Sequence, residues 1–236
     1  MDTRRLIAVI LFALMLTGMV YSQTGITIGG NYWHPKIGIA STNSNDEIEL
    51  GSGSLYGPYV NFRFNKFTLG GSLFVGSMDV DLIDLIGYKY TYKRSDVNVQ
   101  LGFNIYKGLA IFGAIKNAKT KYDDIQDEFG TNYGASQEDK ITLYGGGVSL
   151  SIPLSTSPVF LYGSFALLTG EQESDWYENA KVDVGLASLS FGLGYRATPQ
   201  LYLLGGYRSD ALANSETDDT AETYKGLMFS LGYSIK

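Results

Sequence analysis

The stretch Asp96-Val-Asn-Val-Gln-Leu-Gly-Phe-Asn-Ile105 decides the fold. Its odd-numbered residues are all apolar, whereas its even-numbered residues are polar or glycine. Side chains of a β-strand point alternately to opposite faces, so this period of two predicts a strand with one apolar and one polar face. The same alternation recurs over 67–78 and 223–235, and no stretch after Gln23 carries a helical apolar period.

Alternating runs of this kind recur ten times along the chain. They lie at 25–41, 54–65, 67–78, 92–106, 108–120, 140–153, 158–169, 181–197, 200–209 and 223–235. Short connections between the runs alternate with long ones. The long connections are predicted at 42–53, 79–91, 121–139, 170–180 and 210–222. Short turns at one end and long loops at the other are the plan of outer-membrane barrels. We therefore predict an all-β fold, a ten-stranded antiparallel up-and-down transmembrane β-barrel, with eight strands as the alternative because two runs, 140–153 and 200–209, have blurred faces.

The composition indicates which way the two faces point. The 236 residues include 29 glycines and 18 tyrosines, and only 18% are charged, against about 25% in ordinary soluble domains. A soluble barrel with an apolar interior is the competing fold, but its outer surface would be rich in charged residues. The polar faces here consist mainly of Gly, Ser, Thr, Asn and Tyr, which suit a narrow interior. The apolar faces are therefore predicted to contact lipid.

Charge and cysteine content exclude several classes of function. The net charge is −6, which argues against nucleic acid, since phosphates need clustered Lys and Arg. There is no cysteine, so disulfides, thiolate metal sites and cysteine nucleophiles are excluded.

The first 22 residues have the order of a secretory signal peptide. Two arginines precede an unbroken apolar run over 6–16, and small residues follow up to Ser22. The run is too short to cross a bilayer as a helix, which needs about 20 apolar residues. We predict a cleaved signal peptide over 1–22, cut before Gln23, and a mature barrel over 23–236.

Two of the runs change phase. In the first, the apolar residues move from even to odd positions around Pro35, and a bulge there is the expected cause. In the eighth, they move from even positions before Ala187 to odd positions after Ser188, which predicts a slip at that point. Without the slip, Asp183 would share the lipid-facing side.

These features resemble the small outer-membrane β-barrel proteins of Gram-negative-type bacteria, the broad OmpX, OmpA-barrel and OmpW-like group. The chain has the signal peptide, the alternating strands, the predicted long outer loops and an aromatic residue, Tyr233, in the last strand. Members usually end on an aromatic residue, whereas this chain continues to Lys236. The resemblance implies a monomer in the bacterial cell outer membrane, with outer-membrane lipid and lipopolysaccharide as its partners, and it implies no particular activity.

The polar faces supply the candidates for a functional lumen. Small inward residues leave room for a narrow hydrated path or a small-ligand site; alternatively, paired charges plug the barrel. The predicted lumen-lining residues are Arg63, Asp96, Asn98, Gln100, Lys116, Arg196 and Arg208.

The predicted loops hold most of the acidic residues and several aromatic residues that could make contacts. We expect them to meet an extracellular ligand or surface. The loop contact candidates are Phe129, Tyr133, Trp176 and Tyr177.

No pattern in the chain carries a defined chemistry. The single histidine, His34, cannot form a catalytic triad by itself. The Asp-rich stretches near Asp81, Asp123 and Asp218 lack the spacing of a calcium loop. We therefore predict no catalytic residue, cofactor or metal, and a structural or surface-interaction role such as an adhesin or envelope stabiliser. A narrow pore for ions or small solutes is the alternative, and a hydrolase at the rim is the least favoured.

Overall fold

The computed structural model describes residues 24–41, 47–82, 87–106, 108–132, 137–154, 156–175, 180–214 and 220–235. The predicted signal peptide and three of the loop candidates, Tyr133, Trp176 and Tyr177, lie outside the described residues. Among the described residues, no helix is long and apolar enough to cross a membrane.

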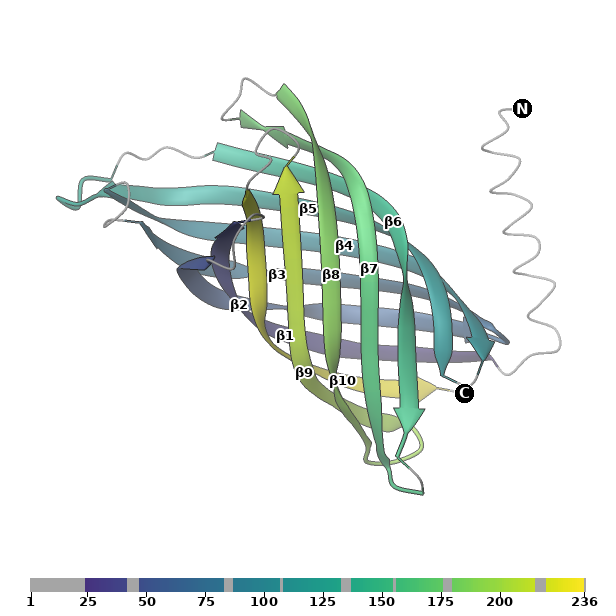
Figure 1. Cartoon of the computed structure of the whole chain (residues 1–236). Coiled ribbons are helices and arrows are strands. Elements are labelled where there is room, and N and C mark those ends of the chain that lie inside the picture. Colours follow the sequence, from purple (N-terminus) through teal and green to yellow (C-terminus); the bar gives the residue numbers. More distant parts are fainter. Residues whose placement is uncertain are drawn as a thin grey trace, which may run out of the picture.

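Ten antiparallel strands close into a single barrel (Figure 1). Each strand pairs with its neighbours in the chain, and β1 pairs with β10 from Ile26↔Ile235 to Ser41↔Thr220. This closure confirms the up-and-down barrel with ten strands and excludes eight. The strands are β1 Thr24–Ser41, β2 Glu47–Phe64, β3 Phe67–Leu82, β4 Tyr88–Tyr106, β5 Leu109–Asp127, β6 Gln137–Pro153, β7 Val159–Ser174, β8 Ala180–Arg196, β9 Leu201–Asn214 and β10 Thr220–Ile235.

The two ends of the barrel differ in their connections. We call the end that carries the connections 65–66, 107–108, 154–158 and 197–200 the turn end; Thr24 and Ile235 also lie there. The opposite end, where the other five connections lie, is the loop end. The connections of the loop end span 42–46, 83–87, 128–136, 175–179 and 215–219.

The strands extend further toward the loop end than the alternation predicted. They contain between 14 and 19 residues, whereas about 9–11 suffice to cross a bilayer. Much of the predicted loops over 79–91, 121–139 and 210–222 is therefore strand, and the prediction of long loops is wrong. The physical reason is that the alternation reverses its polarity within each strand.

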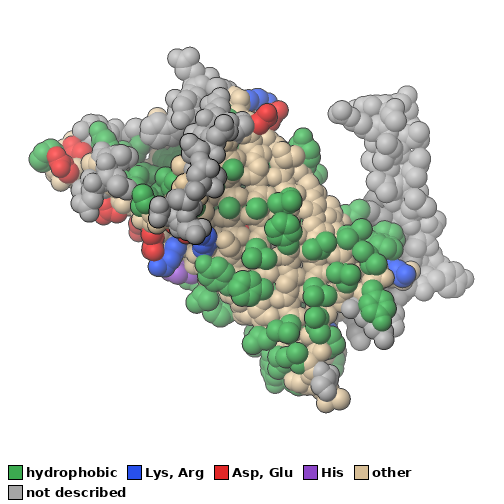
Figure 2. All heavy atoms as spheres, viewed as in Figure 1, with side chains coloured by type: hydrophobic (Ala, Val, Ile, Leu, Met, Phe, Trp, Pro, Cys, Tyr) green, Lys and Arg blue, Asp and Glu red, His purple; other side chains and the backbone are tan. Residues whose placement is uncertain are grey.

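We call the half of the barrel next to the turn end the turn half, and the half next to the loop end the loop half. In the turn half, apolar side chains cover the outside. On β4, Val97, Val99 and Ile105 are all about half exposed and point outward. In the loop half, the outward residues of the same strands are charged, for example Lys93 on β4 and Lys119 on β5. Figure 2 shows hydrophobic side chains scattered over the wall and charged ones gathered toward the loop end.

Aromatic side chains border this apolar band at both edges. At the edge facing the loop end, Tyr32 lies directly opposite Tyr56, and both are exposed. At the turn end, the exposed aromatic residues include Phe67, Tyr106 and Tyr233. Two rings of aromatic residues at the edges of an apolar band are typical of a barrel at two membrane interfaces.

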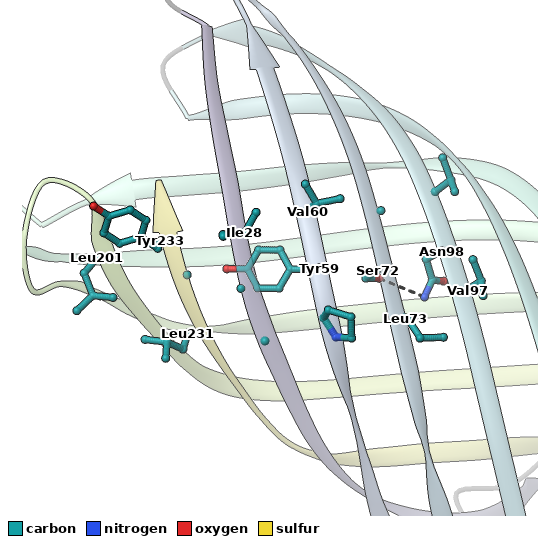
Figure 3. Close-up of a pocket in the computed structure, with 16 residues that line it drawn as sticks. Ile28, Tyr59, Val60, Ser72, Leu73, Val97, Asn98, Leu201, Leu231 and Tyr233 are labelled. Atoms are coloured by element: carbon teal, nitrogen blue, oxygen red, sulfur yellow. Dashed lines mark hydrogen bonds between the residues drawn. The ribbon is translucent and has the colours of Figure 1, made fainter. Parts of the chain in front are cut away.

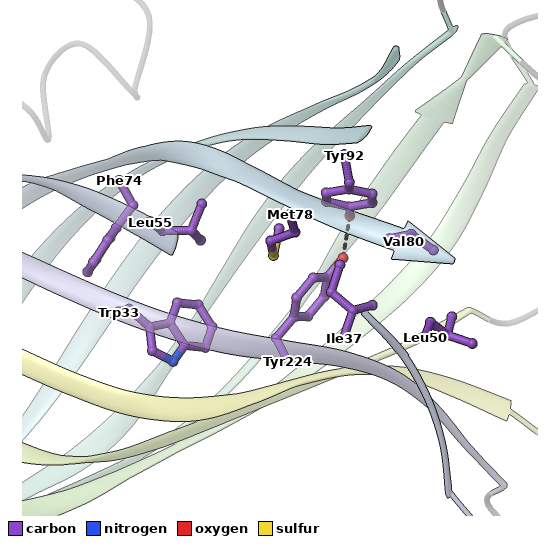
Figure 4. Packing of buried hydrophobic residues seen from close by; sticks show 9 residues of the cluster. All are labelled: Trp33, Ile37, Leu50, Leu55, Phe74, Met78, Val80, Tyr92 and Tyr224. Atoms are coloured by element: carbon purple, nitrogen blue, oxygen red, sulfur yellow. Dashed lines mark hydrogen bonds between the residues drawn. The ribbon is translucent and has the colours of Figure 1, made fainter. Parts of the chain in front are cut away.

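The interior of the loop half is packed with apolar residues. One cluster contains Trp33, Leu55, Phe74, Met78 and Tyr92, which come from the neighbouring strands β1 to β4 and pack together inside the barrel (Figure 4). A second cluster lines the opposite wall and consists of Ala118, Ile141, Leu143, Leu168, Val184, Leu186 and Leu212. Above the apolar band the barrel is therefore built like a soluble protein, apolar inside and charged outside.

This reversal explains both phase changes without the predicted irregularities. β8 pairs with β7 and β9 in one continuous register, so there is no slip at Ala187-Ser188. Val184 faces the interior and Leu189 faces outward because the environment changes along the strand. Asp183 accordingly lies on the outer face of the loop half.

The bulge predicted at Pro35 is also wrong. Pro35 pairs in register with Gly226 on β10 and is fully buried. The register shift between β1 and β2 lies between Ile37 and Gly38, where β2 contributes the extra residue Leu50. Ile37 points inward because it belongs to the apolar interior of the loop half.

Candidate functional site

A cluster of ion pairs crosses the middle of the lumen. The Lys116 ammonium nitrogen on β5 lies 3.0 Å from Asp96 Oδ2 on β4 and 3.3 Å from Asp210 Oδ2 on β9. Arg94 Nε donates to Asp96 Oδ1 over 2.7 Å. Arg208 donates to both carboxylate oxygens of Asp210, at 3.0 and 2.7 Å. Strands on different sides of the barrel are thus joined through charged side chains.

Aromatic rings cover the two arginines of this cluster. The Arg94 guanidinium lies 4.2 Å from the centre of the Tyr224 ring. The Arg208 guanidinium lies 4.5 Å from the Trp33 ring and 5.6 Å from Phe74. Arginine stacks on aromatic faces by cation–π attraction, which is stronger where water is excluded.

The cluster is dry. The exposed fractions are 1% for Asp96, 2% for Lys116 and 0% for Asp210. A water-filled passage through this level would expose these side chains, so the ion pairs and the apolar clusters above them close the lumen. Buried charges need partners, and here every carboxylate contacts two cations.

Of the predicted lumen residues, the structure brings together Asp96, Lys116 and Arg208. Asn98 lies nearer the turn end, and its amide donates to Ser72 over 3.5 Å. Gln100, further along β4, lies beside Gly70 on the inner wall.

The other two predicted lumen arginines lie at the turn end. Arg63 is exposed and belongs to the last pairs of β2 with β3. Arg196 is also exposed, and its guanidinium lies 5.5 Å from the Phe160 ring. Neither arginine is part of the central cluster.

Three members of the cluster were not predicted: Arg94, Ser188 and Asp210. Ser188 Oγ donates to Asp210 Oδ1 over 2.6 Å. Asp210 falls in the predicted loop over 210–222, but it lies on β9. The sequence does hold a signal for two of them, because residues two positions apart on a strand point to the same face. Arg94 precedes Asp96 by two positions, and Asp210 follows Arg208 by two.

Between the cluster and the turn end, tyrosine rings lie over glycines on the inner wall. Tyr59 on β2 lies over Gly29 on β1, and Tyr202 on β9 lies over Gly232 on β10. Their hydroxyl oxygens are 2.7 Å apart. The hydrogen-bonded pair therefore spans the seam between the first and last strands.

The apolar outer wall has a shallow hollow of about 750 Å³ (Figure 3). Ile28, Val60, Leu73 and Val97 line it. Gly30 forms part of its floor, and a Cβ added there would meet no atom within 4 Å. Ser72 and Asn98 also belong to its lining, and they form a hydrogen bond with each other.

The loop end carries one described aromatic candidate. Phe129 is 85% exposed. It lies in a turn that Asp127 organises, because Asp127 Oδ1 accepts hydrogen bonds from the backbone N–H groups of Phe129 and Thr131 at 3.0 and 2.8 Å. Gly130 has a positive φ of 78°, which suits glycine in such a turn. The turn holds the phenyl ring out into solvent.

His34 does not meet an acidic partner. It is on the outward face of β1, and its Nδ1 lies 3.3 Å from Ser54 Oγ. Over the part of the chain that the structure describes, no ion pair includes His34. No group of three or more His, Asp or Glu residues in that part is placed to hold a metal ion.

Solved structures with the same architecture are outer-membrane β-barrels. The translocator domain of the autotransporter NalP from Neisseria meningitidis aligns over 98% of this chain and 95% of its own length, at 11% identity and a TM-score of 0.51. The Yersinia pestis attachment invasion locus protein Ail, solved with the heparin analogue sucrose octasulfate, aligns over 92% and 100%, at 13% identity and a TM-score of 0.43. The outer membrane protease OmpT from Escherichia coli aligns over 92% and 99%, at 10% identity and a TM-score of 0.47.

Identities this low show the fold alone, so the chain shares the fold of small outer-membrane β-barrels. No family model matches the chain, and no curated protein matches it.

Proposed function

We propose that the protein is a non-enzymatic bacterial outer-membrane β-barrel with a closed lumen, which acts through its loop end at the cell surface as an adhesin or envelope stabiliser. The apolar band supports the location. Outward apolar residues on β4 run from Val97 to Ile105, nine positions, which matches the 9–11 residues of a tilted membrane-spanning strand. The turn end then faces the periplasm and the charged loop end faces outward.

The main observation in support of a closed lumen is the buried cluster around Lys116. Its side chains reach across the barrel and are almost fully buried, which supports a closed lumen. Barrels that conduct leave a polar channel open, which needs more strands or a thinner lining. The proposal therefore favours the surface role over the alternative of a narrow pore.

Single-channel recording tests this proposal. The purified, refolded barrel is inserted in a planar bilayer, and we expect no discrete openings. Insertion is checked independently by the heat-dependent shift of folded barrels in gel electrophoresis. Discrete openings whose size changes in Arg208→Gln, but not in the exposed control Arg63→Gln, would show that the cluster lines a pore.

The exposed turn around Phe129 supports a role in surface contact. A rigid turn that presents an aromatic ring offers a contact with little loss of conformational entropy on binding. We expect bacteria that display Phe129→Ala to adhere less to cultured host cells than bacteria that display the parent barrel. Tyr106→Ala, at the turn end, is the matched control because Tyr106 is also largely exposed. Equal adhesion of all three strains would remove the loop end from this role.

The position of His34 supports the absence of catalysis. A hydrolase needs a histidine beside a nucleophile and an orienting carboxylate, whereas His34 contacts Ser54 on the outer wall. We expect no peptide or ester hydrolysis by the refolded barrel. Hydrolysis that disappears in His34→Ala with an intact fold would overturn this part of the proposal.

A further inference from the structure

The interior of the turn half is less filled than that of the loop half. Gln100 on β4 points inward beside Gly70, yet it is exposed. Asn98 and Tyr59 also point inward and are half-buried, whereas Leu143 in the loop half is 1% exposed. An inward side chain is exposed only where the lumen is open to solvent. We call this accessible interior, between the central ion-pair cluster and the turn end, the vestibule.

Aromatic rings form part of the vestibule wall. The Phe160 ring on β7 occupies the space that a side chain at Gly194 on β8 would take, and the Tyr202 ring on β9 does the same at Gly232 on β10. Both rings are half-buried, so part of each is accessible from the vestibule. A ring held against the wall in this way offers an apolar surface on which a planar ligand can stack.

Arg196 lies at the mouth of the vestibule, beside these two rings. It is directly opposite Tyr202 in the register of β8 and β9, so both side chains are on the inner face. Its guanidinium lies 5.5 Å from the centre of the Phe160 ring. The planar guanidinium presents its N–H donors in a fixed geometry that matches a carboxylate.

Arg196 has no carboxylate partner among the residues that the structure describes. The two arginines of the central cluster each form an ion pair with an aspartate. On the described strands, no Asp or Glu lies between that cluster and the turn end, where Arg63 and Lys66 add further positive charge. The vestibule is therefore electropositive, and an anion is the ligand that this charge favours.

The hydrogen-bonded tyrosine pair offers a further donor. Tyr59 and Tyr202 place their hydroxyl oxygens 2.7 Å apart, so one hydroxyl donates to the other. The accepting hydroxyl keeps its own hydrogen, which the pair does not use. Because Tyr202 is opposite Arg196, this donor and the guanidinium belong to the same part of the inner wall.

We propose that the vestibule binds a small organic anion with a planar apolar body, of the aromatic carboxylate class. Arg196 pairs with the carboxylate, the tyrosine pair donates a hydrogen bond to it, and the rings of Phe160 and Tyr202 contact the planar body. Because the central cluster closes the lumen, the ligand enters and leaves through the turn end. This inference goes beyond the proposed surface role, and only the source of the ligand, the periplasm, depends on the orientation proposed above.

The test uses the refolded mature barrel in micelles of an uncharged detergent. The probe is 4-fluorobenzoate, its binding is measured by fluorine NMR, and empty micelles give the background. We expect the parent barrel to bind 4-fluorobenzoate about tenfold more tightly than the neutral 4-fluorobenzamide, which has the same shape. The reason is that a hydrogen bond to a charged group is stronger than one between neutral groups.

The variant Arg196→Gln should weaken the binding of 4-fluorobenzoate about tenfold, with little effect on 4-fluorobenzamide. Lys66→Gln is the matched control, because Lys66 carries the same charge at the same end. Its ammonium nitrogen, however, lies 6.0 Å from the ring centre of Phe103, which is on the outer face opposite the exposed Phe67. We expect parent affinity in the control, and the heat-dependent gel shift checks that every variant is folded.

Each other outcome overturns the proposal. Equal affinity of the parent for the benzoate and the benzamide would show that the positive charge selects nothing. Parent affinity in Arg196→Gln would remove the arginine from the site, and equal losses in both variants would indicate general attraction. Displacement of the probe by acetate as readily as by unlabelled benzoate would show that the rings do not contribute. None of these results bears on the proposed surface role, which channel recording and adhesion test separately.

Discussion

The hydroxyl oxygens of Tyr59 and Tyr202 lie 2.7 Å apart, although 143 residues separate them in the chain. The two rings lie over Gly29 and Gly232, which pair directly across the seam between β1 and β10. A side chain at either glycine would occupy the space of a ring. Four adjacent strands are therefore joined inside the barrel at the point where the sheet closes.

Removing either hydroxyl should weaken this seam. Tyr59→Phe and Tyr202→Phe should each lower the free energy of unfolding by about 1 kcal/mol, because each leaves the other hydroxyl without its partner. The double variant should lose little more than one single variant. Urea unfolding of the refolded barrel in detergent micelles measures all three. Fully additive losses would show that the two hydroxyls act independently.

Two neighbouring glycines should differ in how well they tolerate the same substitution. A Cβ at Gly29 would overlap the Leu231 carbonyl oxygen and the Tyr59 ring, whereas a Cβ at Gly30 meets nothing within 4 Å. Gly29→Ala should destabilise the barrel by about 1–3 kcal/mol, as overpacking does, and Gly30→Ala should change the stability by less than about 0.5 kcal/mol. Urea midpoints compare them. Similar losses at both positions would contradict the inward orientation of Gly29.

The reversed polarity of the loop half predicts different costs for two leucines. Leu143 is buried in the interior, whereas Leu167 is exposed on the apolar band. Leu143→Ala should cost about 2–5 kcal/mol because it leaves a cavity. Leu167→Ala should cost less than about 1.5 kcal/mol, since detergent or lipid fills the space that the side chain leaves. Denaturant unfolding measures both, and equal costs would show that the loop half is not packed.

Lys116 should be essential for the stability of the closed lumen. Lys116→Met leaves the buried carboxylates of Asp96 and Asp210 without their shared ammonium group, at a cost of about 3–5 kcal/mol. Lys181→Met, on the exposed outer wall, should leave the unfolding midpoint unchanged. Unfolding curves and the heat-dependent gel shift report the difference. A stable Lys116→Met barrel would mean that the cluster does not hold the lumen together.

Glu222 should make the stability depend on pH. It lies in the loop half, outside the apolar band, where burial raises its pKa although Arg94 and a hydrogen bond with Tyr224 oppose this shift. A raised pKa means that the folded state binds the proton more tightly than the unfolded chain. The contribution to stability is therefore complete below the pKa of the unfolded chain, which for glutamate is 4.5, and it is lost as the pH rises through the folded pKa.

The variant Glu222→Gln keeps the shape and removes the charge. Its urea midpoint should match that of the parent near pH 4 and exceed it at pH 8. Glu49→Gln, at the exposed Lys36 ion pair, controls for the general effect of removing an acid. A parent barrel that gains stability relative to Glu222→Gln as the pH rises would contradict the raised pKa.

The alternation along the chain was enough to predict the barrel and the number of strands. Alternation is a local property, and in the turn half each side chain's polarity reports directly which face it occupies. The alternation did not predict where the strands end at the loop end of the barrel. Asp123 and Glu138 fall in a predicted loop because they are charged, but they lie on β5 and β6, since outside the bilayer a charged residue on a strand can face water.

The blurred runs have the same explanation. Leu203 is exposed on the outer wall, whereas Leu204 points inward. An apolar residue is suited both to lipid and to the packed interior, so its type alone does not decide its side. The continuous register of the neighbouring strands decides it.

The sequence by itself determined a β-barrel whose apolar face points outward, because the period of two and the scarcity of charge follow from residue order and composition alone. The tertiary structure decided whether the polar residues of the lumen line a channel or pair with one another. Lys116 and Asp210 meet across 94 residues, and only the shear and closure of the barrel bring β5 and β9 face to face. The same polar residues would line a channel in a wider barrel, and here the narrow diameter lets them pair and exclude water.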